Sequence, residues 1–151
     1  MCRGEQEVRS QRSEVRGSLK EENHLITKIK AMIKTVFDLD VFKLSYQFAM
    51  DIFHVTRNFP KEERYSLIDQ IVRSSRSISA NIAEGWGKRI YENDFKRHLV
   101  YAMGSLEETK VWLHFSKDCL YIDEDVFKNI EKKLDKCGAK IYKLHENWRT
   151  L

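Results

Sequence analysis

Residues 74–88 are SSRSISANIAEGWGK, a segment with four serines, an asparagine and two late glycines between two amphipathic stretches. Side chains on a helix are about 100° apart, and on this spacing we predict a helix from about Lys61 to Trp86. Its small and apolar residues cover about half of the circumference, wider than the ~100° stripe of a surface helix. We therefore predict that the helix is covered on two sides, by the bundle core and by a neighbouring subunit. These residues are Leu67, Ile68, Ile71, Val72, Ser74, Ser75, Ile78, Ser79, Ile82, Ala83, Gly85 and Trp86.

A polar line runs beside this stripe and consists of Gln70, Arg73, Ser77, Asn81, Glu84 and Lys88. Residues three or four apart are neighbours on a helix, so Arg73 with Ser77 and Glu84 with Lys88 are candidate pairs. Asn81 and Glu84 lie next to the stripe, and we expect both to be half-buried and to have polar partners. The line predicts a structural or interface role, and an anion-binding rim is the alternative.

Three other segments repeat core residues at alternating steps of four and three, the spacing of helices packed in a bundle. The connections are short, so neighbouring helices are expected to be antiparallel. We predict an all-α, up-down-up-down antiparallel four-helix bundle over residues 37–151. The expected core positions in these segments are Val41, Ser45, Phe48, Ile52, Val55, Phe59, Phe95, Leu99, Ala102, Leu106, Thr109, Leu113, Ser116, Val126, Ile130, Leu134, Cys137, Ile141, Leu144 and Trp148.

Single residues mark the helix ends and the expected close contacts. Pro60 cannot continue the first helix and suits the first turn of the second. Gly85 and Gly87 supply permissive backbone for the exit of the second helix. Gly104, inside the third helix, costs about 1 kcal/mol relative to alanine. We therefore expect Gly104 and Ser105 to pack closely against the second helix.

Residues 1–36 are predicted to be an N-terminal extension that is poorly ordered or partly helical. Residues 1–24 have few apolar side chains, and residues 25–36 have the pattern of a short basic helix. We expect this helix to pack on the domain, and membrane or RNA binding is the alternative. Three cysteines without a CxxC pair favour reduced thiols. No apolar run is long enough for a membrane span, so we predict a cytoplasmic protein.

The sequence lacks the patterns that support catalysis or cofactor binding. No phosphate-binding glycine loop or GxSxG motif is present. A bundle that holds two metal ions needs two Glu-x-x-His motifs, and only residues 21–24 match. His98 and His114 are sixteen residues apart without clustered carboxylates, and we expect them at the surface or an interface. The prediction is therefore a non-enzyme with no metal and no cofactor.

Basic residues gather near the expected turn between the second and third helices. The net charge of +4 leaves the domain nearly neutral, so nucleic-acid binding depends on local clustering. Trp86 and Tyr91 beside the cluster could stack on unpaired bases. A solvated helix end is the alternative. The candidate nucleic-acid-binding residues are Arg73, Arg76, Lys88, Arg89, Lys96 and Arg97.

Four segments then occur in an order that resembles a known family. They are FDLDVFK at 37–43, TRNFP at 56–60, residues 73–85 ending in NIAEG, and GSLEE at 104–108. The chain resembles the bacterial four-helix bundle proteins encoded in intervening sequences of 23S ribosomal RNA genes. Related members are the accessory variability proteins of diversity-generating retroelements. The motif and interface residues implied by the resemblance are Ser77, Asn81, Glu84, Gly85, Gly104 and Ser105.

The resemblance implies a homopentamer without enzymatic activity and, in the retroelement branch, binding of nucleic acid and a reverse transcriptase. This sequence departs from the family at Tyr91, where a Ser or Thr cap is common, at Ser79, where proline is common, and at Met103, where a basic residue is frequent. We also expect residues 1–31 to be an added leader or a misassigned start. We predict an oligomeric scaffold that binds RNA or DNA through a basic surface. The alternative is a protein–protein interaction module without nucleic-acid binding.

Overall fold

The computed structural model describes residues 15–18 and 33–149. The chain divides into two units, Met1–Thr35 and Val36–Leu151. In the first unit, residues 15–18 are helical, and most of the predicted N-terminal extension lies outside the described residues. Residues 33–35 are not helical, so the helix expected over residues 25–36 does not extend through its last turn.

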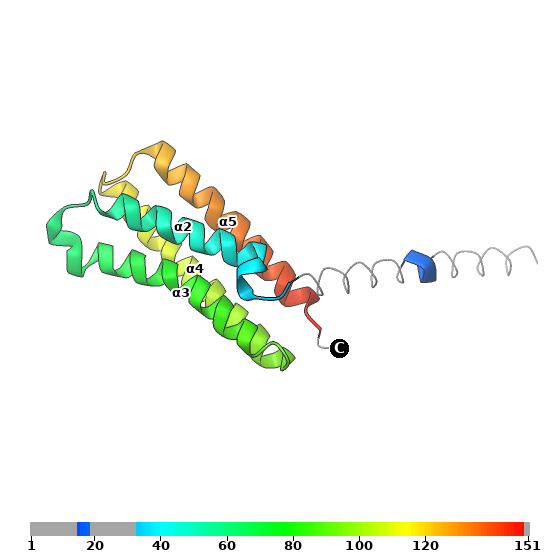
Figure 1. Cartoon of the computed structure of the whole chain (residues 1–151). Coiled ribbons are helices and arrows are strands. Elements are labelled where there is room, and N and C mark those ends of the chain that lie inside the picture. Colours follow the sequence, from blue (N-terminus) through cyan, green and yellow to red (C-terminus); the bar gives the residue numbers. More distant parts are fainter. Residues whose placement is uncertain (1–14, 19–32, 150–151) are drawn as a thin grey trace, which may run out of the picture. The chain divides into compact units, whose positions relative to one another are not determined.

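The second unit is built from four long helices (Figure 1). They are α2 (Asp40–Thr56), α3 (Leu67–Gly87), α4 (Glu92–Asp118) and α5 (Glu124–Asn147), with short 3-10 helices η1 (Val36–Asp38) and η2 (Lys61–Tyr65). Successive helices run in opposite directions; α3 packs against α2 and α4, and α5 packs against α4 and α2. The predicted up-down-up-down antiparallel four-helix bundle is therefore confirmed.

The core follows the predicted spacing most closely in α4. All seven of its expected core residues, from Phe95 to Ser116, are buried. In α5, Phe127 is buried at the helix start, whereas the expected core residue Val126 is only half-buried. Cys137 lies in the interior, and its burial raises the pKa of the thiol to about 12, so the thiol stays protonated.

The buried serines of α3 donate hydrogen bonds within their own helix, and the Ser74 hydroxyl also accepts one from Thr109 of α4 at 3.0 Å. Ser74, Ser75 and Ser79 donate to backbone carbonyls three residues earlier, at 3.3, 3.0 and 3.1 Å. Small side chains with satisfied hydroxyls let neighbouring helices approach closely. Within the chain α3 packs against α2 and α4, while Ile68, Val72 and Ala83 of the stripe are only half-buried. Cover of the stripe by a neighbouring subunit stays a prediction.

The start of α3 also differs from the prediction. The chain from Lys61 to Tyr65 forms η2, and the backbone of Ser66 (φ −123°, ψ −104°) interrupts the helix before Leu67. Glu63 stabilises the backbone at this interruption. Its carboxylate accepts hydrogen bonds from the Ser66 hydroxyl and from the Leu67 amide at 3.3 Å. Tyr121 donates a further hydrogen bond to Glu63 at 3.0 Å. These bonds, with that from Ser66 the largest cause, lower the pKa of the Glu63 carboxyl.

The end of α4 contains a leucine in the left-handed backbone region. Leu120 has φ 61°, and it is the one non-glycine residue with positive φ within residues 15–18 and 33–149. The Tyr121 amide donates to the Ser116 carbonyl at 2.9 Å and the Leu120 amide to the Lys117 carbonyl at 2.8 Å. These two bonds form a Schellman motif, in which the left-handed position normally holds glycine.

We expect Leu120→Gly to raise the free energy of unfolding by about 0.5–1 kcal/mol, because it removes a side-chain clash of the left-handed backbone. The side chain is 88% exposed, so little packing is lost. Urea unfolding of the two proteins measures the difference. Leu120→Ala keeps the clash and serves as the control, with no gain expected. A lower stability for the glycine variant would contradict the prediction.

Candidate nucleic-acid interface

The turn between α3 and α4 brings the two helices into direct contact at Gly85. A Cβ atom placed at Gly85 would lie 2.8 Å from the His98 Cβ and 3.0 Å from the Phe95 ring. Glycine is therefore required here by the close approach of α4. The helix exit is not the reason, since none of the described glycines has positive φ.

Lys88 joins two side chains at this turn. Its ammonium donates to the Glu84 carboxylate at 3.0 Å and lies 2.9 Å from the His98 Nε2. The hydrogen bond from Lys88, its charge and that of His98 lower the pKa of the Glu84 carboxyl. The predicted Glu84–Lys88 pair is confirmed, but Glu84 is exposed and not half-buried. His98 is buried, contrary to the expected surface or interface position, because α4 packs onto Gly85.

Arg89 is held by an aromatic ring. Its guanidinium lies 4.4 Å from the centre of the Trp86 ring and donates to the Trp86 carbonyl at 3.0 Å. Within residues 15–18 and 33–149, no carboxylate pairs with Arg89. An arginine stacked on tryptophan keeps its charge and has reduced side-chain freedom, so less entropy is lost when it binds a phosphate.

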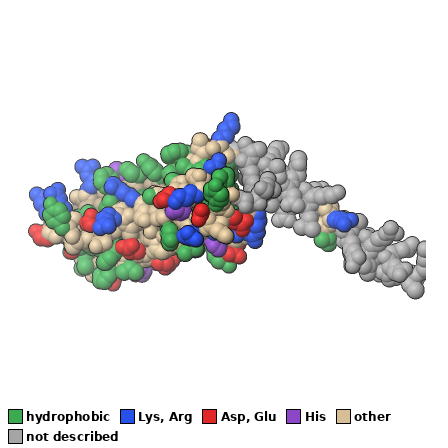
Figure 2. Space-filling model, turned by 90° about the horizontal axis from the view of Figure 1, so that it is seen from below, with side chains coloured by type: hydrophobic (Ala, Val, Ile, Leu, Met, Phe, Trp, Pro, Cys, Tyr) green, Lys and Arg blue, Asp and Glu red, His purple; other side chains and the backbone are tan. Residues whose placement is uncertain are grey.

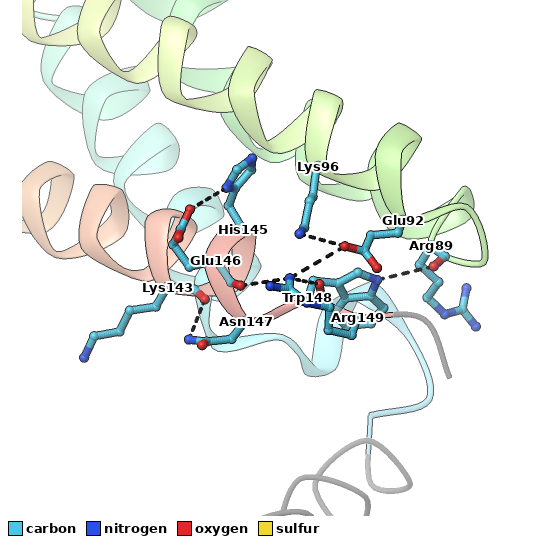
Figure 3. Close-up of polar contacts among 9 residues, drawn as sticks. All are labelled: Arg89, Glu92, Lys96, Lys143, His145, Glu146, Asn147, Trp148 and Arg149. Atoms are coloured by element: carbon cyan, nitrogen blue, oxygen red, sulfur yellow. Dashed lines mark hydrogen bonds and ion pairs between the residues drawn. The ribbon is translucent and has the colours of Figure 1, made fainter.

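The C-terminal segment lies against the same turn (Figure 3). The Trp148 ring packs at 4.6 Å from Phe95 and 6.0 Å from Trp86, measured between ring centres. Its indole nitrogen donates to the Arg89 carbonyl at 3.4 Å. Arg149, next along the chain, then reaches Glu92 at 3.6 Å, so a fifth cation joins the four that the sequence indicated.

We call these groups the turn cluster: Lys88, Arg89, Lys96, Arg97 and Arg149 with Glu84, Glu92 and Asp94. Glu92 lies between two cations, since Lys96 contacts it at 2.8 Å and Arg149 at 3.6 Å. Arg97 pairs with Asp94 at 3.7 Å. In the described part of the chain, five cations thus face three carboxylates, and the cluster keeps an excess of positive charge.

Arg73 and Arg76 do not belong to the turn cluster. Fifteen and twelve residues respectively separate them from Lys88 along α3, or roughly 22 and 18 Å at 1.5 Å per residue. Arg73 pairs with Asp69 at 3.5 Å and not with Ser77, the partner that the sequence suggested. The Arg76 guanidinium lies 5.3 Å from the centre of the Phe53 ring. The six predicted basic residues therefore divide into two groups.

The motif residues hold α3 against α4 at mid-length. The hydroxyls of Ser77 and Ser105 are 2.9 Å apart, and the Asn81 amide donates to the Ser77 carbonyl at 2.9 Å and hydroxyl at 3.1 Å. The half-buried position of Asn81 and the contact of Ser105 with the second helix are as predicted. Gly104 is different: it is exposed, and a Cβ there would meet nothing within 4 Å. In the described part of the chain, the close packing expected for Gly104 is therefore absent.

Arg149 is the cluster residue that sequence reasoning missed. The sequence places Trp148 in the stripe of the last helix, but α5 ends at Asn147 and Trp148 extends the chain towards α3. The signal was an apolar aromatic residue next to an arginine at the end of the stripe. Within residues 15–18 and 33–149, no three metal-binding side chains lie together. No described helix has the length and apolar character to cross a membrane.

Comparison with known proteins agrees with this architecture. The family model described as 23S rRNA-intervening sequence protein matches residues 37–143. The chain belongs to this family. It is similar to a crystal structure, at 1.70 Å resolution, of a protein of unknown function from the S23 ribosomal protein family of Bacteroides thetaiotaomicron VPI-5482. The two share 25% identity with a TM-score of 0.65, over 71% of this chain and 96% of that one. No curated protein matches the chain significantly.

Proposed function

We propose that this family member is a non-catalytic scaffold that binds RNA or DNA phosphates through the turn cluster. The observation that carries the proposal is the stacked Arg89, a cation without a carboxylate partner in the described residues, beside cations from α3, α4 and the C-terminal segment. Clustered Lys and Arg side chains bind nucleic acid by releasing counterions from the phosphate backbone. The excess charge of the cluster suits this mode of binding.

Tyr91 supplies an exposed aromatic group beside the cluster. Its side chain is 63% exposed at the first position before α4, so its ring can stack on an unpaired base. Trp86 cannot do so, because it is buried and Arg89 covers its ring. Of the two aromatic residues that the sequence suggested for stacking, Tyr91 alone supports the proposal. This arrangement favours single-stranded loops over regular duplexes.

The proposal includes self-association, for which the resemblance implies a homopentamer. Its support is an exposed stripe on α4 formed by Val100, Gly104, Val111 and Phe115, with the exposed Glu107 on the same face. These residues share one helix face, and the open Gly104 leaves room for close approach of another backbone. Several copies in one assembly would multiply the charge of the turn cluster. The stripe equally favours the alternative, a protein–protein interaction module, and binding measurements separate the two.

We expect Arg89→Ala with Arg149→Ala to weaken binding of a stem-loop RNA about tenfold, because two phosphate contacts are lost. The slope of log affinity against log salt should fall by about two. Fluorescence anisotropy across a salt series measures both quantities, with duplex DNA as a second probe.

The control is Lys132→Ala with Lys136→Ala on the exposed face of α5, which removes the same charge. It should leave the affinity and the slope nearly unchanged. If the two double variants behave alike, the turn cluster is not the binding site. If neither nucleic acid binds even at low salt, the interaction-module alternative replaces the proposal. Light scattering on the same samples gives the mass, and a monomer would refute self-association.

A further inference from the structure

A groove of about 470 Å³ lies at the other end of α3, between α2, η2 and the first turns of α3. It includes Thr56, Arg57 and Phe59 from the TRNFP motif, which the proposed nucleic-acid site does not use. Figure 2 shows Lys and Arg side chains together with hydrophobic and acidic side chains at the left-hand end of the bundle, where Figure 1 places the connection between α2 and α3. The groove is distinct from the turn cluster in position and in chemistry.

The rim of the groove is basic. Arg57, Lys61 and Arg64 are exposed, and none of them has a carboxylate partner within residues 15–18 and 33–149. The acidic residue of the lining, Asp69, is already paired with Arg73 at 3.5 Å. Among the residues that line the groove, the rim therefore carries an excess of positive charge.

The floor of the groove is apolar and incompletely covered. Phe59 is buried below it, while Phe53, Ile68 and Val72 remain half-buried. Ile68 and Val72 both line the groove at a spacing of about one helical turn, so their partly exposed side chains lie side by side on it. An apolar floor inside a charged rim is the usual composition of a surface that binds a protein segment.

The backbone that forms the groove is already ordered. The Thr56 hydroxyl donates to the Phe53 carbonyl at 3.0 Å, and the amides of residues 57–59 bond the carbonyls of residues 54–56. Pro60, with φ −54°, then directs the chain into η2. A preformed groove costs little conformational entropy when a partner binds. Tyr65 beside it is 88% exposed, and Tyr and Arg are the residue types that dominate binding energy at interfaces.

We infer that this groove docks an acidic peptide segment of another protein, with an aliphatic side chain on the floor and carboxylates on the rim. The positive charge of Arg57, Lys61 and Arg64 attracts an anionic partner. The floor favours a peptide over a nucleic acid, because Ile68 and Val72 offer aliphatic surface and no aromatic face for a base. The Arg76 guanidinium lies 5.3 Å from the centre of the Phe53 ring and covers it. The Phe59 ring packs against Tyr121. Bases would therefore find no platform on which to stack.

The test is selection of a phage-displayed library of random linear peptides on the full chain. We expect enrichment of sequences in which Leu, Ile or Val is flanked by Asp and Glu. A synthetic peptide of the enriched sequence is then measured by anisotropy against Arg57→Glu with Arg64→Glu, and against Val72→Lys. The charge reversal should weaken binding about tenfold or more, because attraction at the rim becomes repulsion. The floor variant should have a similar effect.

Lys43→Glu with Lys132→Glu is the matched control, since it makes the same change in net charge on exposed residues outside the groove. This variant should bind the peptide as the unaltered chain does. A peptide with its aliphatic residues replaced by Ser should bind at least about tenfold more weakly, since the apolar contact is lost. Circular dichroism confirms that each variant keeps its helix content.

Several outcomes would overturn the inference. They are a selection without acidic–aliphatic enrichment, equal binding to the groove variant, and equal binding of the Ser peptide. A single-stranded oligonucleotide that displaces the peptide with comparable affinity would show that the groove is a nucleic-acid site. Loss of self-association in the groove variant would make a second copy its occupant. The inference is independent of the proposed function, because the Arg89 and Arg149 variant leaves the groove intact and should bind the peptide normally.

Discussion

Phe95→Ala is expected to lower the free energy of unfolding by about 3–5 kcal/mol, the largest single effect that we predict. The ring has no exposed surface and lies at the meeting point of α3, α4 and the C-terminal segment. It contacts Trp148 at 4.6 Å and Trp86 at 6.5 Å between ring centres, both in edge arrangements. Truncation leaves a cavity and removes two aromatic contacts. Urea unfolding followed by circular dichroism measures the loss.

The control is Tyr142→Ala in α5, where the side chain is 58% exposed. We expect a loss below about 1 kcal/mol, because most of that surface is already in water. Comparable losses for the two variants would contradict the packing described for Phe95. The Phe95 variant should also change tryptophan fluorescence, since both neighbouring rings are indoles, whereas a merely local effect on α4 would not.

Gly85→Ala is expected to lower the free energy of unfolding by up to about 2 kcal/mol. The added methyl group would lie 2.8 Å from the His98 Cβ, an atom fixed to the α4 backbone, so the two helices must move apart. Overpacking of this kind costs about 1–3 kcal/mol. Replacing glycine by alanine inside a helix stabilises the helix by about 1 kcal/mol, which offsets only part of the overpacking cost. Thermal and urea unfolding measure the net change in the free energy of unfolding.

Gly138→Ala in α5 is the matched control, because a Cβ there would lie 3.7 Å from Leu106, an ordinary contact. It should raise stability by up to about 1 kcal/mol. Both substitutions add one methyl group to a glycine that faces α4. The sign of the stability change therefore shows whether the close approach of the helices or the helix propensity of alanine has the larger effect. A stabilised Gly85 variant would mean that α3 and α4 can separate at this point without loss.

Much of the fold could be predicted from the sequence because long-range packing leaves a local periodic signal. The core residues of α4 recur every three or four positions, so their burial follows once the segment is helical. The same regularity holds for Ile130, Leu134, Cys137 and Ile141 in α5. The cap of α5 is local as well: Asp123 precedes the helix, and its carboxylate accepts from the Val126 amide at 2.8 Å.

The predictions that failed concern residues whose surroundings come from other helices. His98 has a polar side chain, and only the approach of α4 to Gly85 buries it. Glu84 lies beside the stripe but faces water with Lys88. Gly104 was expected to permit close contact within the chain, yet it lies open on α4. A helical wheel gives the angle of a side chain around its own helix but not its distance from the neighbouring helix. The burial of these three residues could therefore not be predicted from the wheel.

The candidate sites show the same division. The sequence indicated the cations at residues 88–97, but only the fold adds Arg149, which Trp148 carries to the turn by packing on Phe95. The groove beside η2 had no signal in the sequence, because its basic rim and apolar floor come from three separate elements. Sequence alone determined the four helices and their inward faces, since helical periodicity is local. The tertiary structure decided which charges meet and which are neutralised, because electrostatic interaction depends on distances between segments far apart in the chain.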